Sequence, residues 1–495
     1  MRNLVLEFYI VYLGYKMRSG RVSPLQVSKF THVRGQYLHI YVPNDQFRSE
    51  RMYILDVILR DFLGIDFTLY FSQNTKNVKL EYCNKKLIVK DDFFRLAQKT
   101  YLTVKSLPSN RLNAINIAEY NLPRSLCITN QLPVLYGKPL ENGKWIQYEN
   151  DSIISGIDIF GSCFFMLTRY EELVKKNIRD KHNRFPASAS IAYQQSFLDR
   201  PIVNEYVEIL WYLIKRLWPL VERKKRQFKI MPTHDVDCLL KWPNVFRLVR
   251  NTGKAILKEK NLSKSIHMIK DYIKLKYGKI RDPYDTFDYL MNFSEKNGLI
   301  SKFFFLVGGK TKFDNFYLFH PYLYKIIDRI NQRGHEIGFH GSYASYNNFK
   351  MLQRELKTLQ NISPQKIFSG RQHFLRWENP ITWRFYEQAG LFYDFTLNFP
   401  EHEGFRCGTC YDYPVYDLIK RKKLNLREIP LIIMDGNLKD YQKLSLEEAL
   451  NRALMLKQRV KKYNGLFTIL WHNSSFDKYD GWEEWKRIYE IMVIS

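Results

Sequence analysis

The chain has 495 residues, of which 45% are hydrophobic and 16% aromatic, and its formal net charge is +27. This composition excludes an intrinsically disordered chain, and the length predicts two or three domains rather than one core. Six cysteines are too few for a disulfide framework and fit a reducing compartment. The positive charge favours polyanions, which include nucleic acid, acidic glycans and anionic membranes, but scattered lysines are also typical of a solvated surface.

The N-terminal stretch 4–14 is apolar, but it contains Glu7 and no small-residue cleavage site. We therefore expect a buried strand there rather than a signal peptide. No run of about 18 apolar residues occurs, so no transmembrane helix is expected. These features predict a cytoplasmic protein, for which peripheral contact with an anionic membrane stays open.

Residues 1–226 are predicted to form a mixed α/β domain of unknown function. Strand-like segments at 37–42 and 67–71 precede helix-like segments, and the basic run 223–226 reads as a linker. No residue of this region indicates catalysis by its chemistry alone. Asp180 and His182 can bind a metal, but a hydrogen-bonded turn before Pro186 is the more common use of such residues.

Residues 227–495 alternate between short apolar strands and amphipathic helices. The predicted strands are 229–234, 302–307, 335–340, 366–370, 391–396, 429–434 and 465–471. The predicted helices are 283–297, 321–333, 347–360, 380–389 and 444–462. This alternation indicates a parallel sheet with right-handed crossovers, and about seven such units favour a closed barrel over an open sheet.

Ionisable residues stand where these strands end. Asp235 and Asp237 follow the first strand, and their spacing of two residues points both carboxylates to the same side. One of such a pair can bind a cation while the other accepts a proton. At later strand ends stand His340, Arg371, His373, Asp394 and His472. In a parallel barrel all of these ends meet at one mouth, so the set predicts a single site.

The order of these motifs resembles the polysaccharide deacetylases, the NodB homology domain of carbohydrate esterase family 4. The matching segments are Asp-x-Asp at 235–237, His-Glu-Ile-Gly-x-His at 335–340, Arg-Gln-His at 371–373 and Leu-x-His at 470–472. The resemblance covers about 229–475 and implies a deformed (β/α)7 barrel. Segments 158–162, 169–172 and 404–410 also resemble a bacterial subgroup that has a preceding domain of unknown function.

The resemblance implies a divalent metal, zinc or another transition metal, and removal of an N- or O-acetyl group from a surface or capsular polysaccharide or its amino-sugar precursor. It makes Asp235 the general base, with Asp237 and His340 as metal ligands. His472 becomes the acid for the leaving amine, Arg371 orients Asp235, and Asp394 holds Arg371. Trp471, Arg406 and Trp377 are the candidate substrate contacts, although aromatic residues in this number mostly fill cores.

One position departs from the family pattern. The second metal-binding histidine is expected four residues after His340, where this chain has Ala344. A hydrolytic zinc site usually has three protein ligands. His373 is the first candidate for the third ligand, and Ser342 and Ser345 are weaker ones. A weakened or lost metal is the remaining alternative, and it would make the chain a glycan-binding or accessory protein on the same fold.

Three further features have several interpretations. Cys407 and Cys410 have the spacing of a redox or half-zinc motif, but they also fit a buried loop or a substrate-lining loop. His335 is five residues from His340, too far around a helix to share a metal, and is expected to be structural. The lysine-rich stretch 243–280 predicts a basic helical insertion. A solvated insertion is more common than one that contacts membrane or nucleic acid, and nucleic acid is the least favoured partner.

Overall fold

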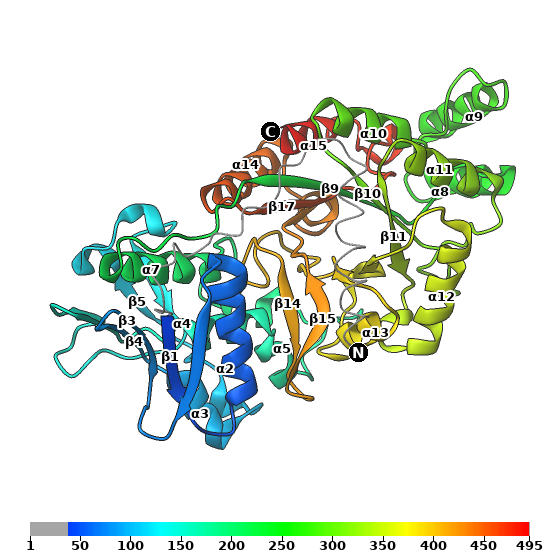
Figure 1. Cartoon of the computed structure of the whole chain (residues 1–495). Coiled ribbons are helices and arrows are strands. Elements are labelled where there is room, and N and C mark those ends of the chain that lie inside the picture. Colours follow the sequence, from blue (N-terminus) through cyan, green and yellow to red (C-terminus); the bar gives the residue numbers. More distant parts are fainter. Residues whose placement is uncertain (1–37, 495) are drawn as a thin grey trace.

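A computed structural model describes residues 38–494 (Figure 1), so the predicted strand at 4–14 lies outside the described residues. The first half contains a mixed six-stranded sheet in the order β2-β1-β3-β4-β8-β7. Its strands are β1 (Leu38–Pro43), β2 (Phe67–Ser72), β3 (Val78–Tyr82), β4 (Lys85–Val89), β7 (Ile146–Tyr148) and β8 (Ser152–Ser155). A two-stranded ribbon, β5 (Asn113–Asn116) and β6 (Gln131–Val134), stands beside it.

The described part of the first half also contains several helices, the last of which packs against β4 and β8. They are α2 (Arg48–Leu55), which continues as a π-helix over Asp56–Leu63, α3 (Asp92–Thr100), α4 (Ile159–Leu167), α5 (Tyr170–Val174), α6 (Ile191–Gln194) and α7 (Ile202–Leu217). α4 is apolar and buried on every side, and its N-terminus is fixed by Asp158, whose carboxylate accepts a hydrogen bond from the Gly161 amide. The α4 side chains thus join the first sheet to the rest of the core.

The second half contains a nine-stranded sheet in the order β14-β15-β13-β12-β11-β10-β9-β17-β16. Its strands are β9 (Lys229–Val236), β10 (Lys302–Phe305), β11 (Glu336–Gly341), β12 (Ser369–Gln372), β13 (Tyr393–Asp394), β14 (Tyr413–Asp417), β15 (Lys422–Glu428), β16 (Ile433–Met434) and β17 (Leu466–Leu470). All neighbouring pairs are parallel except β14 with β15. The carboxyl ends of the parallel strands therefore face one edge.

The segment 422–434 joins the two ends of the parallel set. β15 pairs with β13, and β16, only a few residues further along the chain, pairs with β17. Between them, the Leu431 amide donates to the Leu397 carbonyl, and the Ile432 amide donates to the Thr468 carbonyl. One continuous chain segment thus contacts both outer strands of the parallel set.

The helices that follow the strands lie around the outside of this sheet (Figure 1). They are α10 (Phe287–Lys296), α11 (Pro321–Gln332), α12 (Phe349–Ile362), α13 (Ile381–Gln388), α14 (Leu446–Lys462) and α15 (Lys486–Val493). α14 begins at a capping box in which Ser445 and Glu448 satisfy each other's backbone amides. Gly338 in β11 allows the close approach of β10, because a Cβ there would lie 2.5 Å from the Phe304 ring.

The predicted strand at 429–434 is wrong in extent. The chain forms the antiparallel hairpin β14–β15 up to Glu428, and only Ile433 and Met434 remain as β16. The sequence hides β15 because its exposed positions are Lys422, Lys423 and Asn425, which is also the pattern of a surface loop. This hairpin packs against α2: Tyr53 donates to the Pro414 carbonyl.

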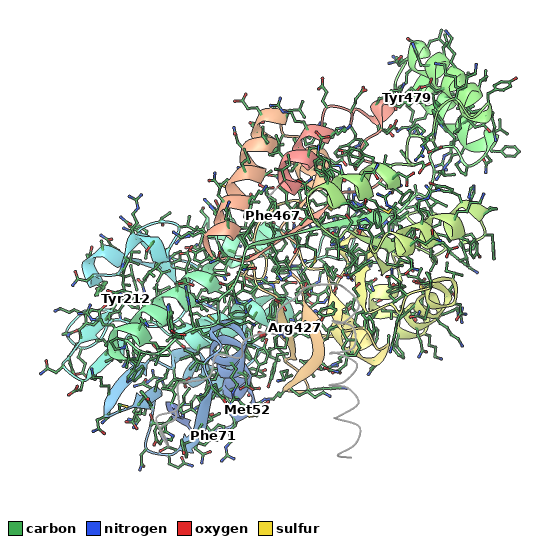
Figure 2. The ribbon with its side chains drawn as sticks, turned by 45° about the horizontal axis from the view of Figure 1, so that its top comes forward. Met52, Phe71, Tyr212, Arg427, Phe467 and Tyr479 are labelled. Carbon is green, nitrogen blue, oxygen red and sulfur yellow. The ribbon has the colours of Figure 1, made fainter. Side chains whose placement is uncertain are left out.

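The two halves share one interior. Arg427 of β15 bonds Asp61 at 2.8 Å, and Figure 2 places Arg427 at this junction. A single hydrophobic cluster runs from the first sheet into the second. The separate folding of residues 1–226 therefore stays a prediction, although the two sheets share no strand.

The stretch 243–280 forms two helices, α8 (Val245–Leu257) and α9 (Leu262–Lys276), which stand out from the body as a hairpin (Figure 1). Within residues 38–494, every helix is too short or too polar to cross a lipid bilayer.

Candidate metal centre

Two carboxylates of the candidate site lie at the end of β9. Asp235 is the second-last residue of β9 and pairs with Phe304 of β10. It is buried, with 2% of its surface exposed. Asp237 follows just beyond the strand, and its side chain is 27% exposed. The strand thus presents one carboxylate inside the sheet and one at its open edge.

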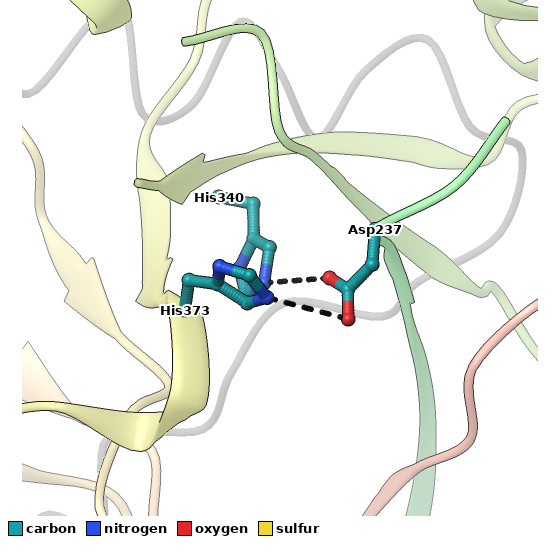
Figure 3. Close-up of side chains that lie close together, drawn as sticks. All are labelled: Asp237, His340 and His373. Carbon is teal, nitrogen blue, oxygen red and sulfur yellow. Dashed lines mark ion pairs between the residues drawn. The ribbon is translucent and has the colours of Figure 1, made fainter. Parts of the chain in front are cut away.

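Three side chains from the ends of β9, β11 and β12 converge at this edge. His340 ends β11 and His373 follows β12, and their ring nitrogens face the carboxylate of Asp237 (Figure 3). His340 Nε2 lies 3.1 Å from Asp237 Oδ1, and His373 Nε2 lies 3.5 Å from Asp237 Oδ2. One ligand atom from each of the three residues lies within 4.8 Å of the others. Among residues 38–494, this is the one group of its kind.

Neighbouring groups fix both histidine rings. His340 Nδ1 donates to the Arg371 carbonyl at 3.0 Å, which leaves Nε2 as the nitrogen that points into the site. His373 Nδ1 contacts Asp314 Oδ1 at 3.3 Å, and Asp314 is itself held by the Tyr343 amide. A carboxylate behind a histidine orients the ring and raises its basicity as a ligand.

The group has the properties of a cation site. His340 Nε2 and Asp237 Oδ1 are buried and make no hydrogen bond, and polar atoms so placed are costly unless a partner satisfies them. Burial alone would raise the pKa of Asp237, but the charge of His373 and the close imidazole of His340 hold that pKa well below its usual value. Two imidazoles and one carboxylate are a donor set that suits zinc and other transition metals.

The serines considered as ligands are occupied elsewhere. Ser342 Oγ donates to Glu355 at 2.6 Å, and Ser345 Oγ donates to the Ser342 carbonyl and to Gln372. The third ligand atom of the candidate group therefore comes from His373, which follows the next strand along the edge.

Arg371 binds the Asp235 carboxylate, as expected. Arg371 Nη1 donates to Asp235 Oδ1 at 2.7 Å, and its other nitrogens donate to Thr233 Oγ1 and the Phe395 carbonyl. The second carboxylate oxygen, Oδ2, lies 3.6 Å from His340 Nε2 and so faces the metal group.

The expectation that Asp394 holds Arg371 stays a prediction: the charge of Arg371 acts on the Asp394 carboxylate, but the hydrogen bonds of the guanidinium go to other groups. The Asp394 carboxylate instead accepts hydrogen bonds from the amide and hydroxyl of Thr396. Burial raises the pKa of Asp394 to about 6, because hydrogen bonds from Thr396 offset only part of the desolvation. β13 places this side chain beside Glu428, where the charge of Arg371 still acts on it.

His472 reaches the same edge from the end of β17. Its Nε2 lies 3.7 Å from Asp237 Oδ2, and its Nδ1 lies 2.9 Å from Asp435 Oδ1. Burial would lower the pKa of His472, but the Asp435 carboxylate outweighs it and raises that pKa to about 10. Asp435 was missed in the sequence, although it directly follows the strand-like run 429–434 and thus fits the same strand-end rule.

The three expected substrate contacts lie in the interior. Trp471 is fully buried among Tyr489, Phe476 and Trp482. Trp377 packs on Trp383, and Arg406 binds Glu172 with two hydrogen bonds, of 2.9 and 2.6 Å. None of these three offers an exposed face to a sugar ring, so their assignment to substrate is wrong. Nothing in the sequence distinguished them from core residues.

The other candidate metal ligands have structural partners. Asp180 accepts hydrogen bonds from the backbone amides of His182 and Arg184, which is the expected turn. Cys407 and Cys410 are buried free thiols, and burial raises the pKa of Cys407 to about 12. Such thiols are inert, which favours the buried-loop interpretation of this segment.

Comparisons with known proteins find distant similarity. Residues 38–219 match the model of a family of unknown function (DUF7033), and the chain matches no curated protein. Among solved structures it is similar to a candidate polysaccharide deacetylase from Mycobacterium smegmatis, with 17% identity over 55% of this chain and 84% of that one, at a TM-score of 0.35.

Two further solved structures are also distantly similar to this chain. BA3943, a CE4 family pseudoenzyme from Bacillus anthracis, is 12% identical over 43% of this chain and 58% of its own length, with a TM-score of 0.24. The polysaccharide deacetylase Bc1974 from Bacillus cereus is 12% identical over 42% of this chain and 79% of its own, with a TM-score of 0.23. These likenesses are too distant to assign an activity, so the site geometry carries the functional conclusion.

Proposed function

We propose that this chain is a metal-dependent carbohydrate deacetylase, a hydrolase that removes an acetyl group from an amino sugar of a polysaccharide or its precursor. The proposal includes a closed (β/α)7 barrel, in which the segment 422–434 supplies one strand position by pairing with β13 and β17. The order of the motifs at residues 235–472 also resembles that of the polysaccharide deacetylases.

A single observation carries the proposal. Asp237, His340 and His373 bring three ligand atoms together at the edge where Asp235 and His472 also lie. A cation-binding group with a carboxylate on one side and an imidazole on the other has the parts that hydrolysis of an acetamide needs.

Asp237, His340 and His373 would hold the cation. When bound, a divalent ion supplies Lewis-acid polarisation of a carbonyl oxygen and lowers the pKa of a nearby water. Asp235 Oδ2 is free to accept a proton from the water that attacks the acetyl carbon, because Arg371 occupies only Oδ1. The guanidinium also keeps that carboxylate from rotating.

His472 completes the reaction on the other side. Its raised pKa keeps the imidazole protonated at neutral pH, and Nε2 is the nitrogen that faces the centre. This nitrogen gives its proton to the leaving amine as the carbon–nitrogen bond breaks, which yields acetate and a free amino sugar. Asp435 holds the opposite nitrogen and so keeps the ring in place.

A glycan-binding protein without catalysis is the alternative that Ala344 raises. The convergence of His373 on Asp237 and His340 removes the reason for preferring it, since three ligand atoms are present without a histidine at 344. We therefore retain hydrolysis as the proposed function.

The test is acetate release from an oligomer of N-acetylglucosamine by purified protein supplied with Zn²⁺, Co²⁺ or Mn²⁺. The wild type is expected to release acetate, and Asp235→Asn is expected to lose about 10²- to 10⁴-fold of that rate while keeping its metal. His267→Ala, on the exposed surface of α9, is the matched control. Equal rates for wild type and Asp235→Asn across N- and O-acetylated sugars would overturn the proposal.

A further inference from the structure

The hairpin α8–α9 exposes an unusual amount of apolar surface. Leu257 is 82% exposed and Leu262 is 62% exposed, although both are aliphatic. The other exposed apolar side chains of the hairpin are Val245, Phe246, Val249, Ile256, Ile266, Ile269, Ile273 and Tyr277. Single exposed apolar residues are ordinary, but a contiguous set of this size marks an interaction surface.

These side chains are arranged in stripes. On α9 the exposed residues Leu262, Ile266, Ile269 and Ile273 recur every three or four positions, which places them along one face. On α8 the exposed apolar residues Phe246, Val249, Ile256 and Leu257 are separated by three, seven and one positions, which keeps them on one side of the helix. A solvated helix would carry polar residues at these positions.

The two stripes lie on the same side of the hairpin. The helices are antiparallel, because Ser265 bonds the Thr252 carbonyl and the Asn261 amide bonds the Ala255 carbonyl. Four of the exposed residues directly follow a buried one, about 100° further around the helix. The pairs are Leu248 and Val249, Ala255 and Ile256, Ser265 and Ile266, and Met268 and Ile269. In an antiparallel pair this common rotation turns both stripes toward one face.

The base of the hairpin is firmly attached to the body. Trp242, Leu248, Met268 and Tyr479 form a small core of their own, and Figure 2 places Tyr479 at the foot of the hairpin. Arg247 also donates to Asn315 at 2.8 Å, in the loop that carries the exposed rings of Phe316 and Phe319. The apolar face is thus a fixed feature of the folded chain, with two aromatic side chains on the adjoining loop.

The charge of the hairpin selects its partner. Residues 244–280 contain ten lysines and arginines but only two carboxylates, Glu259 and Asp271, which gives a net charge of +8. Basic residues also line a cavity of about 640 Å³ between the hairpin and the body, among them Arg247, Arg250 and Lys258. A second copy of this hairpin would be repelled by like charge, and a nucleic acid would leave the apolar stripes unsatisfied.

We propose that the α8–α9 hairpin docks this protein on the surface of an anionic lipid bilayer. The apolar stripes enter the boundary between headgroups and acyl chains, while the lysines and arginines pair with acidic headgroups. Since α8 begins a few residues after Asp237, docking brings the metal group close to the membrane. The docking surface stands on the hairpin alone and does not depend on the proposed catalysis.

The experiment is flotation of the full chain with vesicles of phosphatidylcholine alone and with about 30% phosphatidylglycerol, at low and high salt. The apolar variant combines Val249→Ser, Leu257→Ser, Leu262→Ser and Ile273→Ser. Its matched control replaces four equally exposed residues elsewhere: Val104→Ser, Ile178→Ser, Leu220→Ser and Ile300→Ser. The charge variant is Lys258→Gln, Lys260→Gln and Lys270→Gln, with Lys420→Gln, Lys422→Gln and Lys423→Gln as its control.

The wild type and both controls are expected to float with acidic vesicles, and high salt is expected to weaken binding. The apolar variant is expected to lose at least about 10-fold of its partitioning, and the triple charge variant about 100-fold, at about 5-fold for each lysine. Circular dichroism of the variants verifies that they fold. The proposal is overturned if wild type ignores acidic vesicles or if the control variants lose as much binding. It is also overturned if the hairpin variants abolish self-association or duplex DNA binding while leaving vesicle binding unchanged.

Discussion

At the scale of single residues, the position of His373 explains how the chain assembles three ligand atoms without a histidine at 344. β11 and β12 are parallel neighbours, and His340 pairs in register with Arg371, two residues before His373. A ligand four residues along a loop is thus replaced by one from the next strand end. Asp314 then holds the ring of His373 from behind.

Replacing His373 by alanine is expected to remove stoichiometric zinc from the purified protein, because only two ligand atoms remain. Asp314→Asn is expected to weaken zinc affinity about 10- to 100-fold, since it removes the carboxylate that orients the ring. Competition with a chelating dye measures both affinities, and His267→Ala serves as the control. Full zinc content in the His373 variant would show that another residue is the third ligand.

Asp435 is expected to act as a positioning residue for His472. Asp435→Asn loses the charge that holds the imidazole, so kcat is expected to fall on the order of 10²-fold while KM and zinc content change little. Steady-state kinetics beside metal analysis separates this effect from a damaged metal site. A rise in KM at constant kcat would contradict the positioning role.

At the scale of elements, a buried ionic cluster ties α5 to the loop between β13 and β14. Glu172 accepts two hydrogen bonds from Arg406 and one from Arg169, and all three side chains are buried. Burial would raise the pKa of Glu172, but the two guanidinium groups outweigh it and lower that pKa. The cluster therefore holds the first half of the chain against the second.

Removing one partner of this cluster leaves a buried charge without its counterion. Glu172→Gln and Arg406→Met are each expected to lower the free energy of unfolding by about 3–5 kcal/mol, and the double variant by less than their sum. Urea denaturation measures these values. Asp66→Asn, which breaks an exposed pair with Arg60, is expected to cost under about 1 kcal/mol. Equal costs for the buried and exposed variants would contradict the role of the cluster.

The neighbouring carboxyls of β13 and β15 make stability depend on pH. Burial raises the pKa of Asp394 to about 6 and, together with the charge of Asp394, raises the pKa of Glu428 well above its usual value. The folded state therefore binds these protons more tightly than the unfolded state does. This contribution to stability is complete below about pH 4 and is lost as pH rises through about 6.

Asp394→Asn removes the Asp394 part of this dependence. Between pH 4 and 7, the wild type is expected to lose about 1–3 kcal/mol of unfolding free energy relative to the variant. Urea titrations in the presence of a chelator isolate the effect from metal binding, and the exposed Glu447→Gln is the control. Parallel pH profiles for wild type and Asp394→Asn would refute it.

Alternating periodicity predicted most of the second sheet because its strands are short, apolar and followed by amphipathic helices. β9, β10, β11 and β17 fall within or beside their predicted ranges. The hairpin β14–β15 escaped prediction because the exposed Lys422, Lys423 and Asn425 of β15 have the pattern of a surface loop. Asp314 escaped too, because it comes from a long loop and only tertiary packing brings it behind His373.

At the scale of the whole molecule, zinc binding is expected to stabilise the fold. A ligand that binds the folded state alone adds about 2.7 kcal/mol at 100 times its Kd, so Zn²⁺ is expected to raise Tm by several degrees. Differential scanning calorimetry with and without chelator measures the shift. Asp237→Ala is expected to abolish it, and an equal shift in that variant would place the ion elsewhere.

The most direct test of the account is anomalous diffraction at the zinc edge from crystals of the zinc-loaded protein. We expect one strong peak about 2.0–2.2 Å from a carboxylate oxygen of Asp237 and from one ring nitrogen each of His340 and His373. A peak beside Cys407 and Cys410, or a zinc ion at this edge of the second sheet that His373 does not touch, would contradict the account.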